Sequence, residues 1–143
     1  MSRQQKSKQK TSNWLNRVLV QSSHHLALCL TEEQFHQKLK EMKVPKKNYP
    51  PFLGSWHSHA TTHFLVNEGQ KCAAAIVCIA AMDKYSYAET AALICHEAVH
   101  VWQAIRETLG EEEPSSEFEA YSIQNIVQTL LYEYERLRGK KEK

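Results

Sequence analysis

One segment restricts the fold of this chain more than any other, because it is apolar almost all round when drawn as a helix. It runs from Ala88 to Leu109, and large apolar residues occur on every side of it. Ser86 and Glu89 form a capping box ahead of it, and Gly110 supplies a C-cap after it. A helix of this composition is predicted to be buried, so the rest of the chain must surround it.

Hydrophobic periodicity and turn signals predict the other elements. In the first part of the chain these signals predict a short helix over 14–20, a strand over 25–30, and a helix that begins after a Thr31 cap and is ended by Pro45. A loop over 46–54 follows. The second part is predicted to hold a hairpin of strands 56–66 and 72–79, and a last helix over about 116–136. The predicted fold is α+β, with a small antiparallel sheet packed on the central helix.

Composition fits one globular domain over 1–143, with 42% hydrophobic and 24% charged residues. The net charge of +2 gives no reason to expect a nucleic-acid partner. Charge runs predict frayed basic ends, about 1–12 and 137–143. The longest uncharged apolar stretch, 72–82, is shorter than the roughly 20 residues of a membrane-spanning helix. The sequence has four cysteines but no Cys-x-x-Cys pair, and no apolar leader is seen. These features predict a cytoplasmic protein with reduced, buried thiols.

The predicted central helix contains the motif His96-Glu97-Ala98-Val99-His100. Residues four apart share a helical face, so both imidazoles can reach one metal ion, while Glu97 can sit beside a metal-bound water. A chain of this composition would contain the pattern by chance roughly 0.05 times, so its context must decide. Histidines buried in a core helix would cost several kcal/mol without partners, and a metal ion supplies partners. We therefore predict that His96 and His100 bind zinc and that Glu97 is the general base.

A zinc hydrolase also needs a third protein ligand and an open position for water. Two carboxylates in the next predicted helix, Glu117 and Glu119, are candidates. Ser116 and Glu119 match a capping box, which would occupy Glu119 at the helix start and leave Glu117 free. Periodicity argues the other way, because it places Glu119 nearer the apolar face.

These two segments together resemble the gluzincins, zinc peptidases in which a glutamate on the next helix completes the His-Glu-x-x-His motif. The ImmA/IrrE-type and CAAX-prenyl peptidases carry that glutamate in a Glu-x-x-Ala-Asp/Asn pattern, which Glu117-Phe-Glu-Ala120 matches up to Tyr121. The resemblance covers residues 86 to about 130 and extends to small phage and prophage proteins with the same two elements. It implies zinc as cofactor, His96, His100 and Glu117 as ligands, Glu97 as base, and a protein or peptide substrate.

Other polar and aromatic residues have weaker links to such a site. His57, His59 and His63 alternate, so a strand would put them on one face, with a spacing of about 7 Å that suits a second metal poorly. One of them is a candidate to stabilise an oxyanion. Tyr121, one turn after Glu117, is the candidate electrophilic group. The remaining neighbours are interpreted as packing residues: Tyr85, Tyr87, Cys95 and Trp102.

The predicted function is peptide-bond hydrolysis by a zinc-activated water, with a substrate strand added to the free edge of the hairpin. The alternative is a catalytically silent, zinc-stabilised binding module of the phage-effector type, which would not need Glu97. Basic ends also suggest a DNA-associated peptidase of the SprT-like group. That group usually completes the motif with a histidine, and no histidine follows His100.

Overall fold

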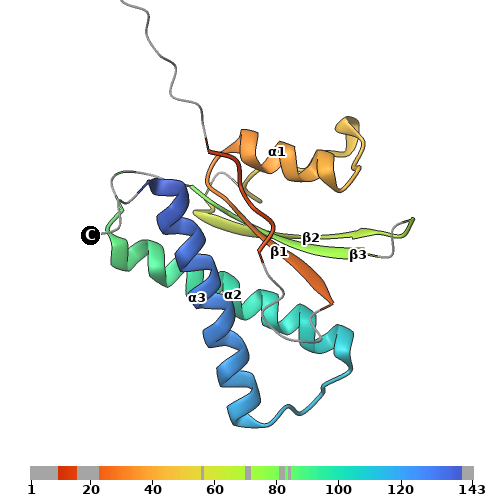
Figure 1. Ribbon diagram of the computed structural model, residues 1–143, viewed down its shortest axis with the longest axis vertical. Coiled ribbons are helices and arrows are strands. Elements are labelled where there is room, and N and C mark those ends of the chain that lie inside the picture. Colours follow the sequence, from red (N-terminus) through yellow and green to blue (C-terminus); the bar gives the residue numbers. More distant parts are fainter. Residues whose placement is uncertain are drawn as a thin grey trace, which may run out of the picture.

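The computed structural model describes residues 10–15, 23–55, 57–69, 72–80, 83 and 85–139, and in them it has the predicted α+β class. The elements, in chain order, are β1 (His24–Cys29), α1 (Glu32–Glu41), a 3-10 turn (Lys46–Asn48), β2 (Ala60–Asn67), β3 (Cys72–Ile79), α2 (Tyr87–Leu109) and α3 (Ser116–Arg138) (Figure 1). No helix among these residues is both long and apolar enough to cross a membrane.

The three strands form a mixed sheet in the order β1-β3-β2. β2 and β3 form the predicted antiparallel hairpin, closed by the pair Asn67 and Cys72. β1 runs parallel to β3, with Cys29 beside Cys78. The prediction of an antiparallel sheet is therefore wrong for β1. The reason is the connection, because α1 and β2 lie between β1 and β3 in the chain and return it to the same end of the sheet.

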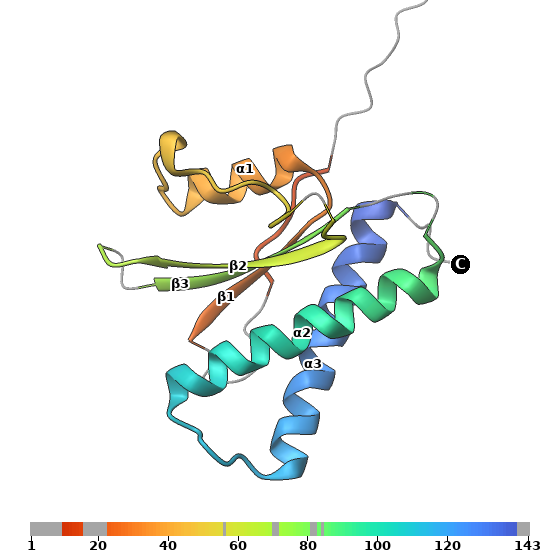
Figure 2. The same ribbon diagram turned by 180° about the vertical axis from the view of Figure 1, so that it is seen from behind.

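β3 is buried on both of its faces. Ala75, Val77 and Ile79 pack in one core cluster with residues of α2 and α3. Ala74, Ile76 and Cys78 point the other way and pack in a second cluster with residues of α1. Figure 2 shows this arrangement of layers, with α1 on one side of the sheet and α2 and α3 on the other.

α2 is buried on one face only. Ile94, Ala98, Val101, Trp102 and Ile105 are covered by the sheet and α3, with exposed fractions of 3% or less. The exposed residues on the uncovered side include Cys95, His96, Val99 and His100. The prediction of a helix buried all round is thus wrong, because two packing partners do not enclose a helix. Cys95 is correspondingly exposed, and all four cysteines are free thiols.

Side-chain caps fix the helix starts. Thr31 accepts the amide of Gln34 at 3.2 Å, and Ser86 accepts that of Glu89 at 3.1 Å, as predicted. At α3 the cap is Ser115, which accepts the amide of Phe118 at 3.3 Å. The capping box predicted one residue later is therefore wrong.

The end of α1 also differs from the prediction. The helix ends at Glu41, four positions before Pro45, because Lys43 adopts a φ of 59°, in the left-handed region. The amide of Lys43 still donates to the carbonyl of Lys40 at 3.0 Å. The turn that follows Met42 therefore stops the helix before the proline is reached.

Residues 10–15, which we name the N-terminal strap, cover the outer edge of β1. Leu15 forms an antiparallel bridge with Leu26, and the Ser12 hydroxyl donates to the carbonyl of Leu28 at 2.7 Å. The helix predicted over 14–20 is wrong for Trp14 and Leu15, which are extended, and residues 16–20 lie outside the described part of the chain. The strap leaves β2 as the sheet edge without a neighbouring strand in the described residues.

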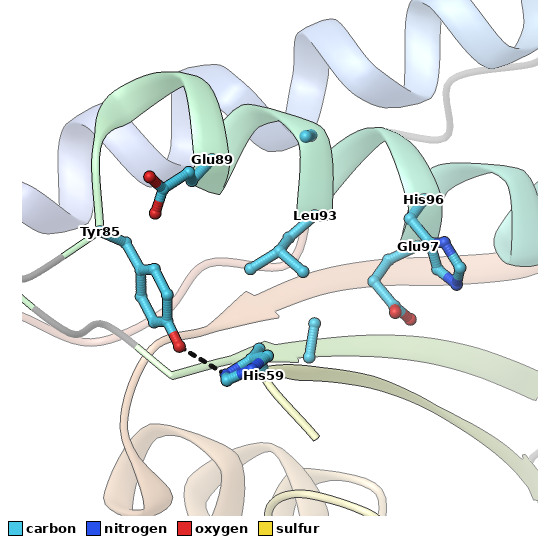
Figure 3. Close-up of a pocket in the computed structure, with 8 residues that line it drawn as sticks. His59, Tyr85, Glu89, Leu93, His96 and Glu97 are labelled. Carbon is cyan, nitrogen blue, oxygen red and sulfur yellow. Dashed lines mark hydrogen bonds between the residues drawn. The ribbon is translucent and has the colours of Figure 1, made fainter. Parts of the chain in front are cut away.

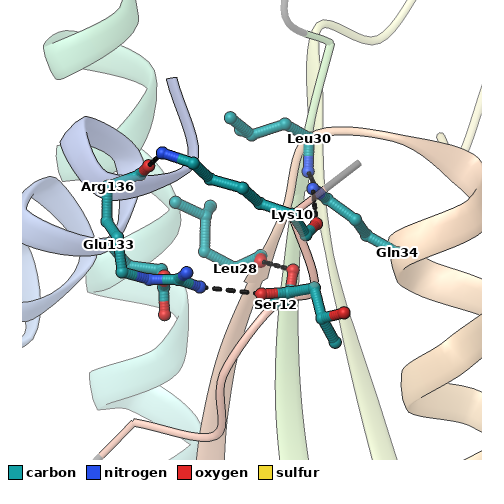
Figure 4. Close-up of polar contacts among 8 residues, drawn as sticks. Lys10, Ser12, Leu28, Leu30, Gln34, Glu133 and Arg136 are labelled. Carbon is teal, nitrogen blue, oxygen red and sulfur yellow. Dashed lines mark hydrogen bonds and ion pairs between the residues drawn. The ribbon is translucent and has the colours of Figure 1, made fainter. Parts of the chain in front are cut away.

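The strap is also tied to the end of α3 (Figure 4). Lys10 Nζ donates to the carbonyl of Arg136 at 2.9 Å, and the Arg136 guanidinium donates to the carbonyl of Thr11 at 2.8 Å. Arg136 also pairs at 2.5 Å with Glu133, a carboxylate that is only 3% exposed. Residues 10–12 and 137–138, which the charge pattern assigned to frayed ends, are thus part of the folded structure.

We expect Arg136→Ala to lower the free energy of unfolding by about 3 kcal/mol, because it leaves the buried Glu133 without its counter-charge. Chemical denaturation at neutral pH measures the change. Arg138→Ala is the matched control, since its ion-pair partner Asp83 is exposed and such pairs contribute about 1 kcal/mol or less. Equal, small losses in the two variants would contradict a structural role for the buried pair.

Candidate functional site

The two motif histidines meet on the exposed side of α2. His96 and His100 are one turn apart, and their Nε2 atoms lie 3.1 Å from each other. Two nitrogens bound to a tetrahedral zinc ion at about 2.05 Å each would be about 3.3 Å apart. The imidazoles therefore already have nearly the separation that a shared metal ion requires.

Gln103 orients the second histidine. Its side-chain oxygen, Oε1, accepts a hydrogen bond from Nδ1 of His100 at 3.2 Å. A proton on Nδ1 leaves the lone pair on Nε2, which is the tautomer that binds a metal through that atom. The sequence carries this signal as an amide three residues after His100, on the same helical face, and Gln103 was not among the predicted site residues.

Glu97 lies beside the histidine pair and is 6% exposed. Its Oε2 accepts a hydrogen bond of 2.5 Å from the hydroxyl of Thr62 on β2. This bond connects the sheet to α2 and fixes the direction of the carboxylate. In Figure 3 the Glu97 carboxylate and the His96 ring project from α2 into the same space. Thr62 is a positioning residue that the sequence analysis did not single out.

Two cavities lie along the groove between α2 and β2, and His96 and Glu97 line both of them. One, of about 440 Å³, lies toward the start of α2 and is lined by His96, Glu97, Tyr85 and His59 among others. The second, of about 460 Å³, is lined by His96, Glu97 and His100 together with Ala60, Thr61, Thr62 and Phe64 of β2. His96 and Glu97 thus lie where both cavities meet, while His100 borders the second one.

β2 presents backbone groups along this groove. The amide of Ala80 donates to the carbonyl of His59 at 3.0 Å. The backbone N–H and C=O groups of His59 therefore point toward β3. Alternation along an antiparallel strand then directs the backbone N–H and C=O groups of Ala60, Thr62 and Phe64 away from β3. These groups are in position to pair with an added extended chain.

The carboxylates of α3 are not brought to the histidine pair. Glu119 Oε2 accepts the indole N–H of Trp102 at 2.9 Å, on the side of α2 away from His96. Glu117 is exposed in the first turn of α3. Tyr121, 61% exposed, also lines neither cavity at the pair. Within the described residues, no group of three or more His, Cys, Asp or Glu side chains is arranged to hold a metal ion.

The fit to zinc is therefore partial. The two imidazoles fit, in separation and in the tautomer of His100, while α3 does not supply the third position in this arrangement. The indole bond explains what Glu119 does instead of capping the helix. It gives this carboxylate a packing role against the largest fully buried side chain of the core.

The three alternating histidines do not share one strand face, because β2 begins only at Ala60. His57 and His59 precede the strand. His63 is in it but points to the α1 side, where it stacks on Phe35 with a ring separation of 4.5 Å. Only His59 lines the groove, and its Nδ1 is 2.6 Å from the hydroxyl of Tyr85.

Comparisons with known proteins supply no relative from which a role could be transferred. The chain has no significant match among protein-family models, curated proteins or solved structures.

We expect Glu119→Ala to lower the free energy of unfolding by about 1–3 kcal/mol, because it leaves the buried Trp102 N–H without an acceptor. Glu117→Ala should cost less than about 1 kcal/mol, the contribution of an exposed acid to a helix dipole. Thermal and chemical denaturation of the two variants measure the difference. A larger loss in Glu117→Ala than in Glu119→Ala would contradict the packing role of Glu119.

Proposed function

We propose that this chain is a zinc-dependent peptidase of zincin-like type, with His96 and His100 as metal ligands and Glu97 as general base. One observation carries the proposal. The Nε2 atoms of the two imidazoles lie 3.1 Å apart on an exposed helix face, next to a buried, oriented carboxylate. In this arrangement the two imidazoles share a hydrogen bond, and a zinc ion in place of the shared proton would hold the same two atoms at nearly the same separation.

Zinc bound at this pair would supply Lewis-acid polarisation of a peptide carbonyl and a water with a pKa lowered to about 7. The chain itself provides the proton transfer. Glu97 Oε2 is held by Thr62, so the other oxygen, Oε1, is the atom that would take a proton from the water and pass it to the leaving amine. The short hydrogen bond keeps the carboxylate aimed into the groove throughout.

The groove supports an extended polypeptide as the substrate. Backbone groups of Ala60, Thr62 and Phe64 point outward along β2, and a strand paired with them would pass in front of the histidines. Main-chain hydrogen bonds of this kind hold a scissile carbonyl in a fixed position without depending on its side chains. The open edge of β2 therefore supports a peptide rather than a small molecule.

Glu117 is the proposed third ligand on the basis of its match to the Glu-x-x-Ala pattern, and Tyr121 the proposed electrophilic group. Both belong to the first two turns of α3, which follow an exposed loop over 110–115. Engagement of either residue requires that these turns shift toward the groove. The histidine pair does not depend on that shift.

A second function is a zinc-stabilised binding module without turnover. The observation that favours it is the bond between Thr62 and Glu97, which gives the carboxylate a structural use between sheet and helix. A module of this kind would use the same groove to hold a partner strand. Removal of the Glu97 charge without change of shape separates the two functions.

We expect purified protein to bind about one equivalent of zinc, and His96→Ala and His100→Ala each to abolish high-affinity binding. Elemental analysis and competition with a zinc chelator measure this. His36→Ala is the matched control, because His36 is a partly exposed helical histidine that pairs with Glu32 on α1. Unchanged zinc affinity in His96→Ala would remove the metal from the proposal.

The same assay applied to Glu117→Gln tests the third ligand. A loss comparable to that of His96→Ala would indicate that the carboxylate binds the metal. Full retention would leave His96 and His100 as the protein's ligands.

We expect Glu97→Gln to keep zinc content and melting temperature nearly unchanged, because the amide oxygen can still accept the Thr62 hydroxyl. Peptide hydrolysis should fall about 10²- to 10⁴-fold with loss of the general base. Sequencing of new protein termini in cells that express wild type or Glu97→Gln measures cleavage without a known substrate. Identical termini in both strains would favour the binding module.

A further inference from the structure

The cavity toward the start of α2, which we name the Glu89 cavity, has a chemical character that the peptidase proposal does not use. It has a volume of about 440 Å³ and borders His96 and Glu97 directly. A side chain of a polypeptide lying along β2 could enter it while the backbone stays at the histidine pair. Its lining therefore selects among substrates.

The walls of the Glu89 cavity are aliphatic. Ala60 comes from the start of β2, and Ala92 and Leu93 come from the second turn of α2. Alanines on both sides leave room for a slender chain, and Leu93 offers its flank to methylene groups (Figure 3). Such walls suit the unbranched stem of a long side chain.

Tyr85 and His59 give one part of the cavity lining a polar character. The Tyr85 hydroxyl and His59 Nδ1 lie 2.6 Å apart, and their rings meet edge to face with centroids 5.3 Å apart. Tyr85 precedes α2 and His59 precedes β2, so this pair joins the two walls beyond the strand end. It keeps that part of the cavity polar and offers a hydroxyl and an imidazole to a bound side chain.

The charge of the lining is negative. It includes two carboxylates, Glu89 and Glu97, and no lysine or arginine among the described residues. Glu97 already accepts the Thr62 hydroxyl and serves as the base in the proposed reaction. Glu89, exposed on the same side of α2 one turn before Leu93, is the carboxylate available to a ligand.

We propose that the Glu89 cavity is a subsite for a lysine or arginine side chain of the substrate. The aliphatic stem packs on Ala92 and Leu93, and the cation pairs with the exposed carboxylate of Glu89. This inference rests on the proposed peptidase function and gives it a substrate class: extended polypeptides with a basic residue at a fixed position from the scissile bond.

The first experiment is cleavage of a degenerate peptide library by the zinc-loaded protein, with Glu97→Gln as the blank and mass spectrometry to locate new termini. We expect lysine or arginine to be enriched at one position. Glu89→Gln should reduce the preference for lysine over norleucine about fivefold, the factor of an exposed ion pair, and Glu89→Lys should favour acidic residues there. Glu33→Gln, which also removes an exposed acid from a helix first turn, should change nothing.

The second experiment measures binding without turnover. Acetyl-lysine methylamide and its norleucine analogue are titrated into wild type and Glu89→Gln, with the methyl resonances of Ala92 and Leu93 as reporters. We expect the lysine compound to shift both methyl groups in wild type and to bind more weakly in Glu89→Gln.

The two experiments separate failure of the subsite from failure of the reaction. Binding of the lysine compound at Ala92 and Leu93 without any library cleavage would overturn the peptidase and retain a basic-residue site. Cleavage without a basic preference, or equal binding of lysine and norleucine compounds, would overturn the subsite and leave the peptidase standing.

Discussion

The structure depends on the burial of β3 on both faces. Its alternate residues are divided between two core clusters, so α1 must cover one side of the sheet and α2 with α3 the other. The small side chains of Ala74 and Ala75 let both layers approach the sheet closely. Among the described residues the sheet has three strands, and α2 contacts the edge strand β2 through the bond between Glu97 and Thr62. The motif histidines lie beside this contact, on the side of α2 that the core does not cover.

Much of this fold could be predicted from the sequence, since β1, α1, the hairpin, α2 and α3 all follow local signals of period and capping. The errors came from features that local signals do not encode. Parallel pairing of β1 depends on the end of the sheet to which the chain returns after α1, and no residue within β1 indicates that end. The apolar residues around α2 look alike whether or not a partner covers them, so Cys95 and Val99 gave no indication of their exposure. Adjacent serines at 115 and 116 fit the cap of α3 equally well.

The candidate site likewise has a part that the sequence predicted and a part that it did not. The spacing of His96 and His100 made their convergence predictable, because a helix imposes it. The partners of these residues were harder to find, since Thr62 lies on another element and only the tertiary fold brings it to Glu97. Glu119 was interpreted as a cap because its spacing from Ser116 fits one, whereas the fold uses it for the indole of Trp102. The sequence alone did not predict these contacts between distant elements.

The N-terminal strap has a consequence for the order in which the molecule can assemble. Lys10 and Arg136 are 126 positions apart, so their contact cannot form until α3 has been synthesised. Parallel pairing of β1 with β3 likewise waits for the whole hairpin. Non-local contacts of this kind slow folding, because chain entropy is lost before they stabilise anything. During synthesis the N-terminal strap can therefore contact β1 well before its hydrogen bonds to Arg136 of the last helix are able to form.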